Sequence, residues 1–149
     1  GMFHLTQSLL PLLLKAASPE DPARVVNVGS VMGEVPKGTA TYSYAVSKGA
    51  VHHMTRVLSN DLAPEFITVN AIAPGPFPSK MTDFALGSEE GRAESAKGVP
   101  LGRVGTAEDI AGALQFLCSR AGAYVSGAIL PLSGGMQSAA PISIFNEDL

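Results

Sequence analysis

The sequence predicts an α/β fold, in which the short strands of one parallel sheet alternate with longer helices. The composition fits a globular chain of ordinary domain size, since 46% of the 149 residues are apolar and 15% are charged. Three short strand-like runs occupy residues 24–28, 66–72 and 128–132, and longer segments with helical spacing stand between them. This alternation is typical of parallel sheets whose crossover connections are helices.

The first third should supply a helix, a strand and a loop. Residues 3–17 predict a helix that is apolar on most sides, and such a helix needs cover on several faces. After a polar break at 19–22, the β-branched residues of 24–28 indicate a strand buried in the sheet. Residues 29–41 are rich in glycine and small side chains. We expect this loop to pass over the ligand site, because ligands of open α/β sheets bind beyond the carboxyl ends of the strands.

The middle of the chain predicts a long helix over residues 42–63, which Pro64 ends, and then a second strand over residues 66–72. Asn70 in that strand is expected to bond neighbouring backbone rather than a ligand. Prolines at 74, 76 and 78 stiffen the turn that follows. The buried stripe of the helix is expected to consist of Val46, Ala50, Met54, Val57, Leu58 and Leu62.

The last third should contain a lid, a helix, a strand and a tail. Residues 80–98 are polar, small and glycine-bearing, which predicts a mobile, partly helical substrate lid. Thr106 should cap the helix that follows, with acidic residues at its positive N-terminal end. Residues 128–132 form the last strand, in which Pro131 indicates an edge position or a local break in the ladder. Residues 136–149 form a C-terminal tail.

The pair Tyr44 and Lys48 points to a particular chemistry. Positions four apart share one face of a helix. An ammonium beside a phenol favours the phenolate, which makes the phenol a better acid–base catalyst near neutral pH. Ser30, upstream of the pair, could hold a carbonyl oxygen within reach of the phenol. Tyr42 is the rival phenol, but two residues turn a helix by about 200°, so Tyr42 and Lys48 do not share a face.

Four blocks of the sequence resemble the short-chain dehydrogenase/reductase family, in the family's order and with ordinary spacing over residues 1–136. The blocks are VVNVGSVMG at 25–33, YAVSKGA at 44–50, ITVNAIAPG at 67–75 and GAILPLSGG at 127–135. The resemblance implies that residues 1–149 are the catalytic half of such a domain. It implies the C-terminal portion of a Rossmann-like, doubly wound parallel sheet with about three strands and flanking helices. The blocks are similar to those of 3-oxoacyl reductase-like members.

The resemblance also implies roles for individual residues. As a catalytic set, Tyr44 would exchange a proton with the substrate while hydride passes to or from NAD or NADP, and Ser30 would orient the carbonyl. Lys48 would supply its field to the phenol and, with Tyr44, belong to the cofactor site by holding the nicotinamide ribose. Further positions that match the family's nicotinamide contacts are Pro74, Gly75, Phe77 and Ser79. Glycine permits close backbone approach there, and simple packing is the alternative role for Phe77.

The resemblance begins in the middle of the family's sequence pattern. No Gly-x-x-x-Gly-x-Gly loop precedes Ser30, although that loop binds the pyrophosphate at a helix N-terminus. The family's active-site asparagine would fall just before residue 1. We therefore expect a chain without the N-terminal dinucleotide-binding half, whether through cloning, proteolysis or a truncated gene, and inactive alone. The residue that selects NAD or NADP belongs to that half.

Charge and cysteine content argue against several other functions. A net charge of −3 gives no electrostatic footprint for nucleic acid or an anionic membrane, and no apolar run is long enough to span a bilayer. Cys118, the single cysteine, permits no intrachain disulfide and is expected to be a small buried residue, which is compatible with a cytoplasmic protein. No metal site is predicted from His4, His52 and His53, because adjacent histidines on a helix point about 100° apart.

Two functions remain open. The first is an NAD- or NADP-dependent oxidoreductase that interconverts a ketone and a secondary alcohol, with 3-oxoacyl compounds among the small-molecule substrates considered. The second is an inactive truncated member that acts as an assembly or binding piece. A homo-oligomer, either a dimer or a tetramer, is expected, since the family's counterparts of residues 3–17 and 42–63 pack against a second subunit. An open edge at strand 24–28 should also favour association.

Overall fold

The structure, a computed structural model of the chain, describes residues 1–35 and 41–138. Its centre is a parallel sheet of three strands, β1 (Ala23–Val28), β2 (Ile67–Pro74) and β3 (Ile129–Leu132), in the order β1-β2-β3. The register pairs Val28 with Ile72 and Ala73 with Pro131. The expected α/β sheet is confirmed. Of the two alternatives that Pro131 indicated, the edge position is the one found, since β3 is an outer strand among the described residues.

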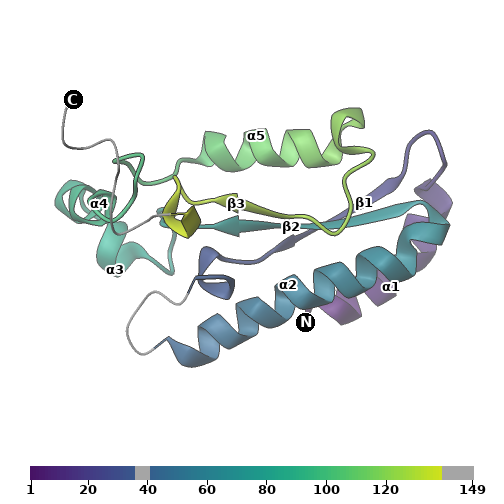
Figure 1. Cartoon of the computed structure of the whole chain (residues 1–149), viewed down its shortest axis with the longest axis horizontal. Coiled ribbons are helices and arrows are strands. Elements are labelled where there is room, and N and C mark those ends of the chain that lie inside the picture. Colours follow the sequence, from purple (N-terminus) through teal and green to yellow (C-terminus); the bar gives the residue numbers. More distant parts are fainter. Residues whose placement is uncertain (36–40, 139–149) are drawn as a thin grey trace.

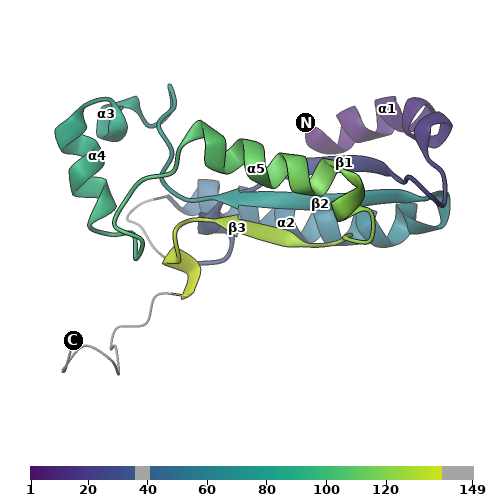
Figure 2. The ribbon, with the colours of Figure 1, turned by 90° about the horizontal axis from the view of Figure 1, so that it is seen from above.

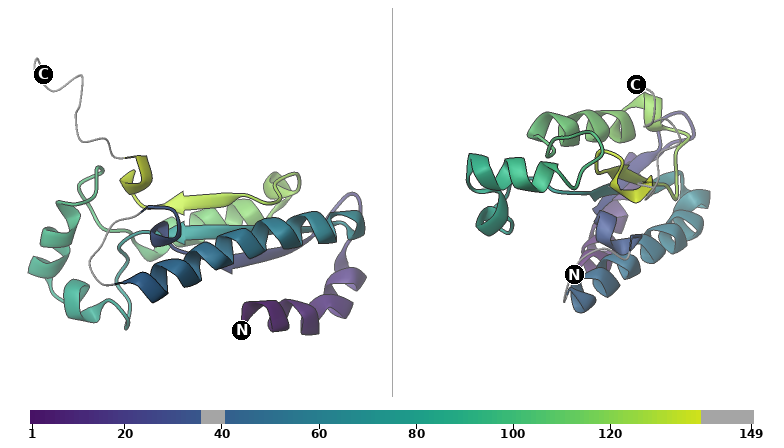
Figure 3. Two further views of the ribbon diagram at one scale, coloured as in Figure 1. Left: turned by 60° about the horizontal axis from the view of Figure 1, so that its bottom comes forward. Right: turned by 60° about the vertical axis from the view of Figure 1, so that its left-hand side comes forward.

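Helices cover both faces of the sheet. Helices α1 (Met2–Ala16) and α2 (Tyr42–Leu62) lie on one face, and α5 (Ala107–Cys118) lies on the other (Figure 1). In the right-hand view of Figure 3, α5 and α2 lie on opposite sides of the strands. Every residue of β2 except Pro74 is buried, because this strand has a neighbour on each side and helices above and below.

Two apolar clusters hold the layers together. Between the sheet and helices α1 and α2, Leu58 packs with Ile67 and Val69. Between the sheet and α5, Leu117 packs with Ile72. Helix α1 nevertheless leaves Leu5, Leu9 and Leu12 exposed in the structure, although an apolar helix of this kind was expected to need cover on several faces. None of the helices in residues 1–35 and 41–138 combines the length and apolarity needed to cross a bilayer.

Two short helices, α3 (Asp83–Leu86) and α4 (Glu89–Ala96), lie apart from the layers at the end of the sheet where β2 stops (Figure 2). They fall within residues 80–98, for which partial helicity was expected. The segment 29–41, expected as a loop, contains one 3₁₀ turn, η1 (Val31–Gly33), and its residues 36–40 lie outside the described part of the chain. The tail over 136–149 begins with a further turn, η4 (Met136–Ser138), and continues outside the described residues.

The buried face of α2 differs from the expected apolar stripe. Val46 is 72% exposed and Val57 is 45% exposed, whereas the buried residues of the helix are Val51, His52, Thr55 and Leu58. His52 and Thr55 can be buried because each has a partner in the interior: Asn27 Nδ2 donates to Thr55 Oγ1 at 2.9 Å, and the Ser30 N–H donates to His52. A hydropathy pattern counts both residues as polar and so omits them. Of the expected stripe, Met54, Leu58 and Leu62 do pack in the core, whereas Val46 and Val57 do not.

The expected burial of Cys118 was also wrong, because the structure exposes this cysteine. Leu117 faces the sheet and is buried. The next position on a helix lies about 100° further around, which turns Cys118 toward the outside.

Asn70 is bonded to backbone, as expected. Its side chain is 1% exposed, Nδ2 donates to the Val125 carbonyl at 2.7 Å, and Oδ1 accepts from the Ala128 N–H at 3.0 Å. The amide thus fastens the segment before β3 to the central strand.

We expect the Asn70→Ala substitution to lower the free energy of unfolding by about 2–4 kcal/mol, because a buried polar group left unpaired costs about 1–3 kcal/mol and two groups lose their partner. Urea denaturation followed by circular dichroism measures the change. The matched control is Asn60→Ala on the exposed side of α2, where no comparable loss is expected. Equal stability of the two variants would contradict the structural role of Asn70.

Candidate active site

The carboxyl ends of the strands bring the sequence-predicted site residues to one edge of the molecule. Because the strands are parallel, Ser30 after β1 and Gly75 after β2 emerge at the same edge. The Gly29 N–H donates to the Ile72 carbonyl at 2.8 Å, and the Gly75 N–H donates to the Leu132 carbonyl at 2.9 Å. The three strands are thus still joined one residue beyond each paired segment.

Ser30 is buried at the start of the turn η1. Its hydroxyl oxygen accepts the Met32 N–H at 3.2 Å and thereby caps the turn. Its backbone N–H donates to His52 Nε2 at 3.3 Å. A hydroxyl has one donor and two acceptor sites, so capping leaves the Ser30 proton able to donate to another group.

Tyr44 and Lys48 lie on the first turns of α2, one turn apart. The Lys48 Nζ atom lies 5.6 Å from the centroid of the Tyr44 ring, and it donates to the Val28 carbonyl at 3.0 Å. A cation at that distance is attracted to the electron-rich face of the ring. Val28 is the last residue of β1, so Lys48 is tied to the strand that leads into Ser30. Tyr42, the rival phenol, is 83% exposed.

The Ser30 turn and the Tyr44–Lys48 helix are packed directly against each other. A Cβ added to Gly33, at the end of η1, would come within 2.8 Å of the Lys48 carbonyl carbon. The structure therefore brings the neighbourhoods of Ser30, Tyr44 and Lys48 together, although Ser30 is far from the pair along the chain.

Of the four residues expected to contact a nicotinamide, Pro74 ends β2, and Gly75, Phe77 and Ser79 lie in the turn that follows. Gly75 approaches β3 so closely that an added Cβ would lie 3.0 Å from Ser133 Cα. The ring of Phe77 packs against Gly105, where an added Cβ would lie 2.2 Å from the ring. Close packing against neighbouring residues thus accounts for Gly75 and for the Phe77 ring, independently of any ligand.

Thr82 organises this turn and was missed in the sequence. Its hydroxyl donates to the Phe77 carbonyl at 2.7 Å and accepts the Ser79 N–H at 2.9 Å. The Ser79 and Thr82 hydroxyl oxygens are 3.0 Å apart. Ser79 is exposed and Pro74 is partly buried. A threonine three residues after a serine is a pattern of local turn bonding, and that spacing is the signal that could have identified Thr82.

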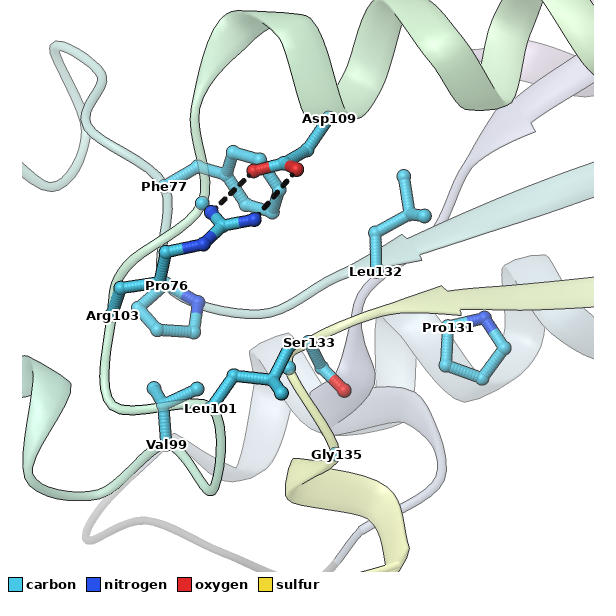
Figure 4. Close-up of a pocket in the computed structure, with 12 residues that line it drawn as sticks. Pro76, Phe77, Val99, Leu101, Arg103, Asp109, Pro131, Leu132, Ser133 and Gly135 are labelled. Atoms are coloured by element: carbon cyan, nitrogen blue, oxygen red, sulfur yellow. Dashed lines mark hydrogen bonds and ion pairs between the residues drawn. The ribbon is translucent and has the colours of Figure 1, made fainter.

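A cavity of about 330 Å³ opens beside this turn (Figure 4). Pro76 and Phe77 line one part of it and Ser133 another, whereas Ser30, Tyr44 and Lys48 are not among its lining residues. At its rim the Arg103 guanidinium makes two bonds to the Asp109 carboxylate, at 2.6 and 2.9 Å. The bonds from Arg103 hold the pKa of Asp109 well below its usual range. The cavity adjoins the turn predicted to contact the cofactor and does not enclose the residues predicted to be catalytic.

His52 is the second residue that sequence reasoning missed. The imidazole is 2% exposed and contacts the residues on both sides of Ser30. Burial lowers its pKa below the ordinary value of 6.5. The available signal was position, since residues 44, 48 and 52 follow one another at intervals of four along one helix face. Among the described residues, no three His, Cys, Asp or Glu side chains gather as a metal site.

The chain is similar to proteins that are named as reductases and dehydrogenases. The family model described as enoyl-(acyl carrier protein) reductase matches residues 1–137. The chain is 42% identical over 135 residues to the rhamnolipids biosynthesis 3-oxoacyl-[acyl-carrier-protein] reductase of Pseudomonas aeruginosa, with 91% of this chain and 53% of the relative covered.

Two solved structures extend the comparison. The Pseudomonas aeruginosa RhlG/NADP active-site complex has a TM-score of 0.86 and 42% identity, covering 91% of this chain and 54% of that one. A 7α-hydroxysteroid dehydrogenase complexed with NADH and 7-oxo glycochenodeoxycholic acid has a TM-score of 0.78 and 35% identity, covering 90% and 50%. The chain spans about half the length of the curated relatives it matches.

Proposed function

The chain belongs to the short-chain dehydrogenase/reductase family, and from that membership we propose that it carries the acid–base half of an NAD- or NADP-dependent oxidoreductase. The reaction is the interconversion of a ketone and a secondary alcohol. One observation carries the proposal: the Lys48 ammonium lies beside the Tyr44 ring and is bonded to Val28, two residues before Ser30.

The three catalytic residues divide the work. In the direction of reduction, the Tyr44 hydroxyl donates its proton to the carbonyl oxygen, and in oxidation the phenolate takes a proton from the alcohol. Lys48 places a positive charge beside the Tyr44 ring. Ser30 donates its hydroxyl proton to the same substrate oxygen, while its own oxygen stays bonded to the Met32 N–H.

The residues at this edge fit a nicotinamide cofactor, which when bound supplies or accepts the hydride. An ammonium has three N–H donors, and Lys48 uses one on Val28, so donors remain for the ribose hydroxyls. Pro74, Gly75, Phe77 and Ser79 supply backbone groups and one hydroxyl for the carboxamide. Thr82 already bonds the Phe77 carbonyl, and it therefore holds this turn in shape.

The substrate lid over residues 80–98 is the element expected to select the ketone. It comprises α3 and α4, and it exposes Met81 and Phe84. Two relatives have names that point to different ketones, a 3-oxoacyl carrier-protein ester and a 7-oxo bile acid. We take 3-oxoacyl thioesters as the first substrate class to test.

The test is a reduction assay on the longest open reading frame that contains this chain. NADH and NADPH are each supplied with a short 3-oxoacyl thioester, a cyclic ketone and a 7-oxo bile acid, and nucleotide absorbance reports turnover. We expect turnover with at least one ketone, and a clear preference for one nucleotide. Failure with every pair would contradict the oxidoreductase proposal.

The open side of β1 favours a second candidate function, that of an assembly piece. Among the described residues β1 pairs only with β2, and an apolar groove runs along it beneath α1, lined in part by Leu9, Leu13 and Val25. An unpaired strand edge invites another chain, so a homo-oligomer is proposed here too. Calorimetry of NADH and NADPH binding to residues 1–149 separates the two candidates, because an assembly piece should bind neither and tight binding would exclude it.

A further inference from the structure

We propose that His52 is a positioning residue for the Ser30 turn, which its neutral imidazole holds in place and which its protonation releases. The inference rests on the proposed function, because Ser30 matters to the reaction only if the chain belongs to an oxidoreductase. It assigns to a buried histidine the task of orienting the catalytic serine and of setting the acid limit of activity.

The turn is wrapped around the imidazole ring. Gly29 and Gly33, on either side of Ser30, both contact it: an added Cβ would lie 2.2 Å from His52 Nε2 at Gly29 and 2.8 Å from Cε1 at Gly33. Between these contacts the Ser30 N–H donates to Nε2. The ring thus touches the turn on both sides of the serine and bonds the serine itself, so it defines where the Ser30 backbone lies.

The direction of the Ser30 bond determines the form of the ring. A backbone N–H is a donor only, so Nε2 must be unprotonated, and the neutral ring then carries its proton on Nδ1. Nδ1 is buried without a hydrogen-bond partner among the described residues, and the nearest carboxylate oxygen of Glu34 is 3.7 Å away. A second proton would convert Nε2 into a donor facing the Ser30 N–H. Two donors cannot bond each other, so the turn would leave the ring.

The charged groups that face His52 from the described elements have opposite effects. Glu34, next to η1, raises the pKa of His52, whereas Arg56 and Lys48 on α2 lower it, and burial is the largest cause, lowering it below 6.5. Between pH 6.5 and the lower pKa of the folded protein, the unfolded chain therefore binds more protons than the folded protein. The neutral imidazole contributes its full stabilisation above pH 6.5, and this contribution is lost as the pH falls through that range. Activity should be lost at lower pH, as the pH falls through the lowered pKa of His52 in the folded protein.

The first experiment distinguishes the loss of the hydrogen-bond acceptor at His52 from a change in the shape of its side chain. In the longest open reading frame that contains this chain, His52→Leu removes the acceptor, and we expect kcat to fall roughly ten- to a hundredfold, because misplacing a catalytic group by about 1 Å can cost about a hundredfold. His52→Gln supplies an amide oxygen as acceptor and does not titrate. It should retain kcat within about fivefold and lose the acid limb of the pH profile. Equal kcat in both variants, or an unchanged acid limb in His52→Gln, would overturn the proposal.

Two milder variants keep the test sharp if the His52 substitutions fail to fold. Glu34→Gln removes a charge that raises the pKa of His52, so the acid limb should move to lower pH. Arg56→Gln removes a charge that lowers that pKa, so the limb should move to higher pH. Neither residue is part of the proposed catalytic set, and shifts of opposite sign support the inference. Shifts of the same sign, or none, would refute it.

A spectroscopic measurement tests the role of His52 without an activity assay. In the ¹⁵N-labelled protein, His52 Nε2 should show the resonance of an unprotonated ring nitrogen, with a scalar coupling to the Ser30 amide proton. Both signals should change together on acidification. An Nε2 that is protonated at neutral pH would exclude the positioning role. If no ketone is reduced but the coupling is present, the proposed function fails while the role of His52 in holding the turn stands.

Discussion

Replacing Tyr44 with phenylalanine should lower kcat/KM for ketone reduction by about a hundred- to ten-thousandfold, the range that a general acid contributes. The substitution removes a single oxygen. The ring remains beside the Lys48 ammonium, so the fold and the placement of Lys48 should persist. What is lost is the proton that neutralises the developing alkoxide. Steady-state kinetics gives the loss of activity, and a thermal melt verifies that the variant is folded.

Tyr42→Phe is the matched control for that experiment. It makes the same chemical change two residues earlier in the same helix, at a largely exposed phenol that lies about 200° around the helix from Tyr44. Its kcat/KM should stay within about twofold of the parent protein. A similar loss in both variants would show that the effect belongs to the helix rather than to the Tyr44 hydroxyl, and retained activity in Tyr44→Phe would defeat the catalytic assignment.

Gly29→Ala is expected to damage both the fold and the activity. The added methyl group would lie 2.2 Å from His52 Nε2 and 3.1 Å from the Ile72 carbonyl oxygen. The ring has little room to retreat, since it is buried and also contacts Gly33. Overpacking of this kind costs about 1–3 kcal/mol or more. Displacing the ring also breaks the Ser30 bond, so activity should fall together with the free energy of unfolding.

The control is Gly112→Ala in α5, where an added Cβ meets no atom within 4 Å. Alanine in a helix is favoured over glycine by roughly 0.5–1 kcal/mol, so this variant should be slightly more stable than the parent protein. Urea denaturation of the two variants measures the contrast. A Gly29→Ala variant with unchanged stability would mean that the imidazole does not lie where the structure has it.

The elements that could be predicted from the sequence are those that local chemistry decides. The strands expected at 24–28, 66–72 and 128–132 agree with the structure to within about two residues at each end. Short apolar runs between helical segments are typical of buried strands. The pairing of Tyr44 with Lys48 on one helix face follows from helix geometry alone. The family could be recognised because its blocks depend on residues near one another in the chain.

The burial of His52 and Thr55 on α2, the exposure of Cys118 and the contacts of His52 with the Ser30 turn could not be predicted in this way. His52 looked like one of two adjacent histidines on a helix, and nothing near it in the sequence shows that Gly29 and Gly33 come to either side of its ring. Its burial depends on a hydrogen bond to a residue 22 positions away. The hydropathy pattern of a helix contains no information about a hydrogen-bond partner so distant in the chain.

The sequence by itself determined the strands and helices and the alignment of a phenol with an ammonium, because backbone propensity and the period of a helix act over a few residues. Only the tertiary structure decided that the Ser30 turn wraps a buried imidazole and that Lys48 is tied to the end of β1. Those contacts join segments that are distant in the chain, and they form only when the parallel strands bring their carboxyl ends to one edge.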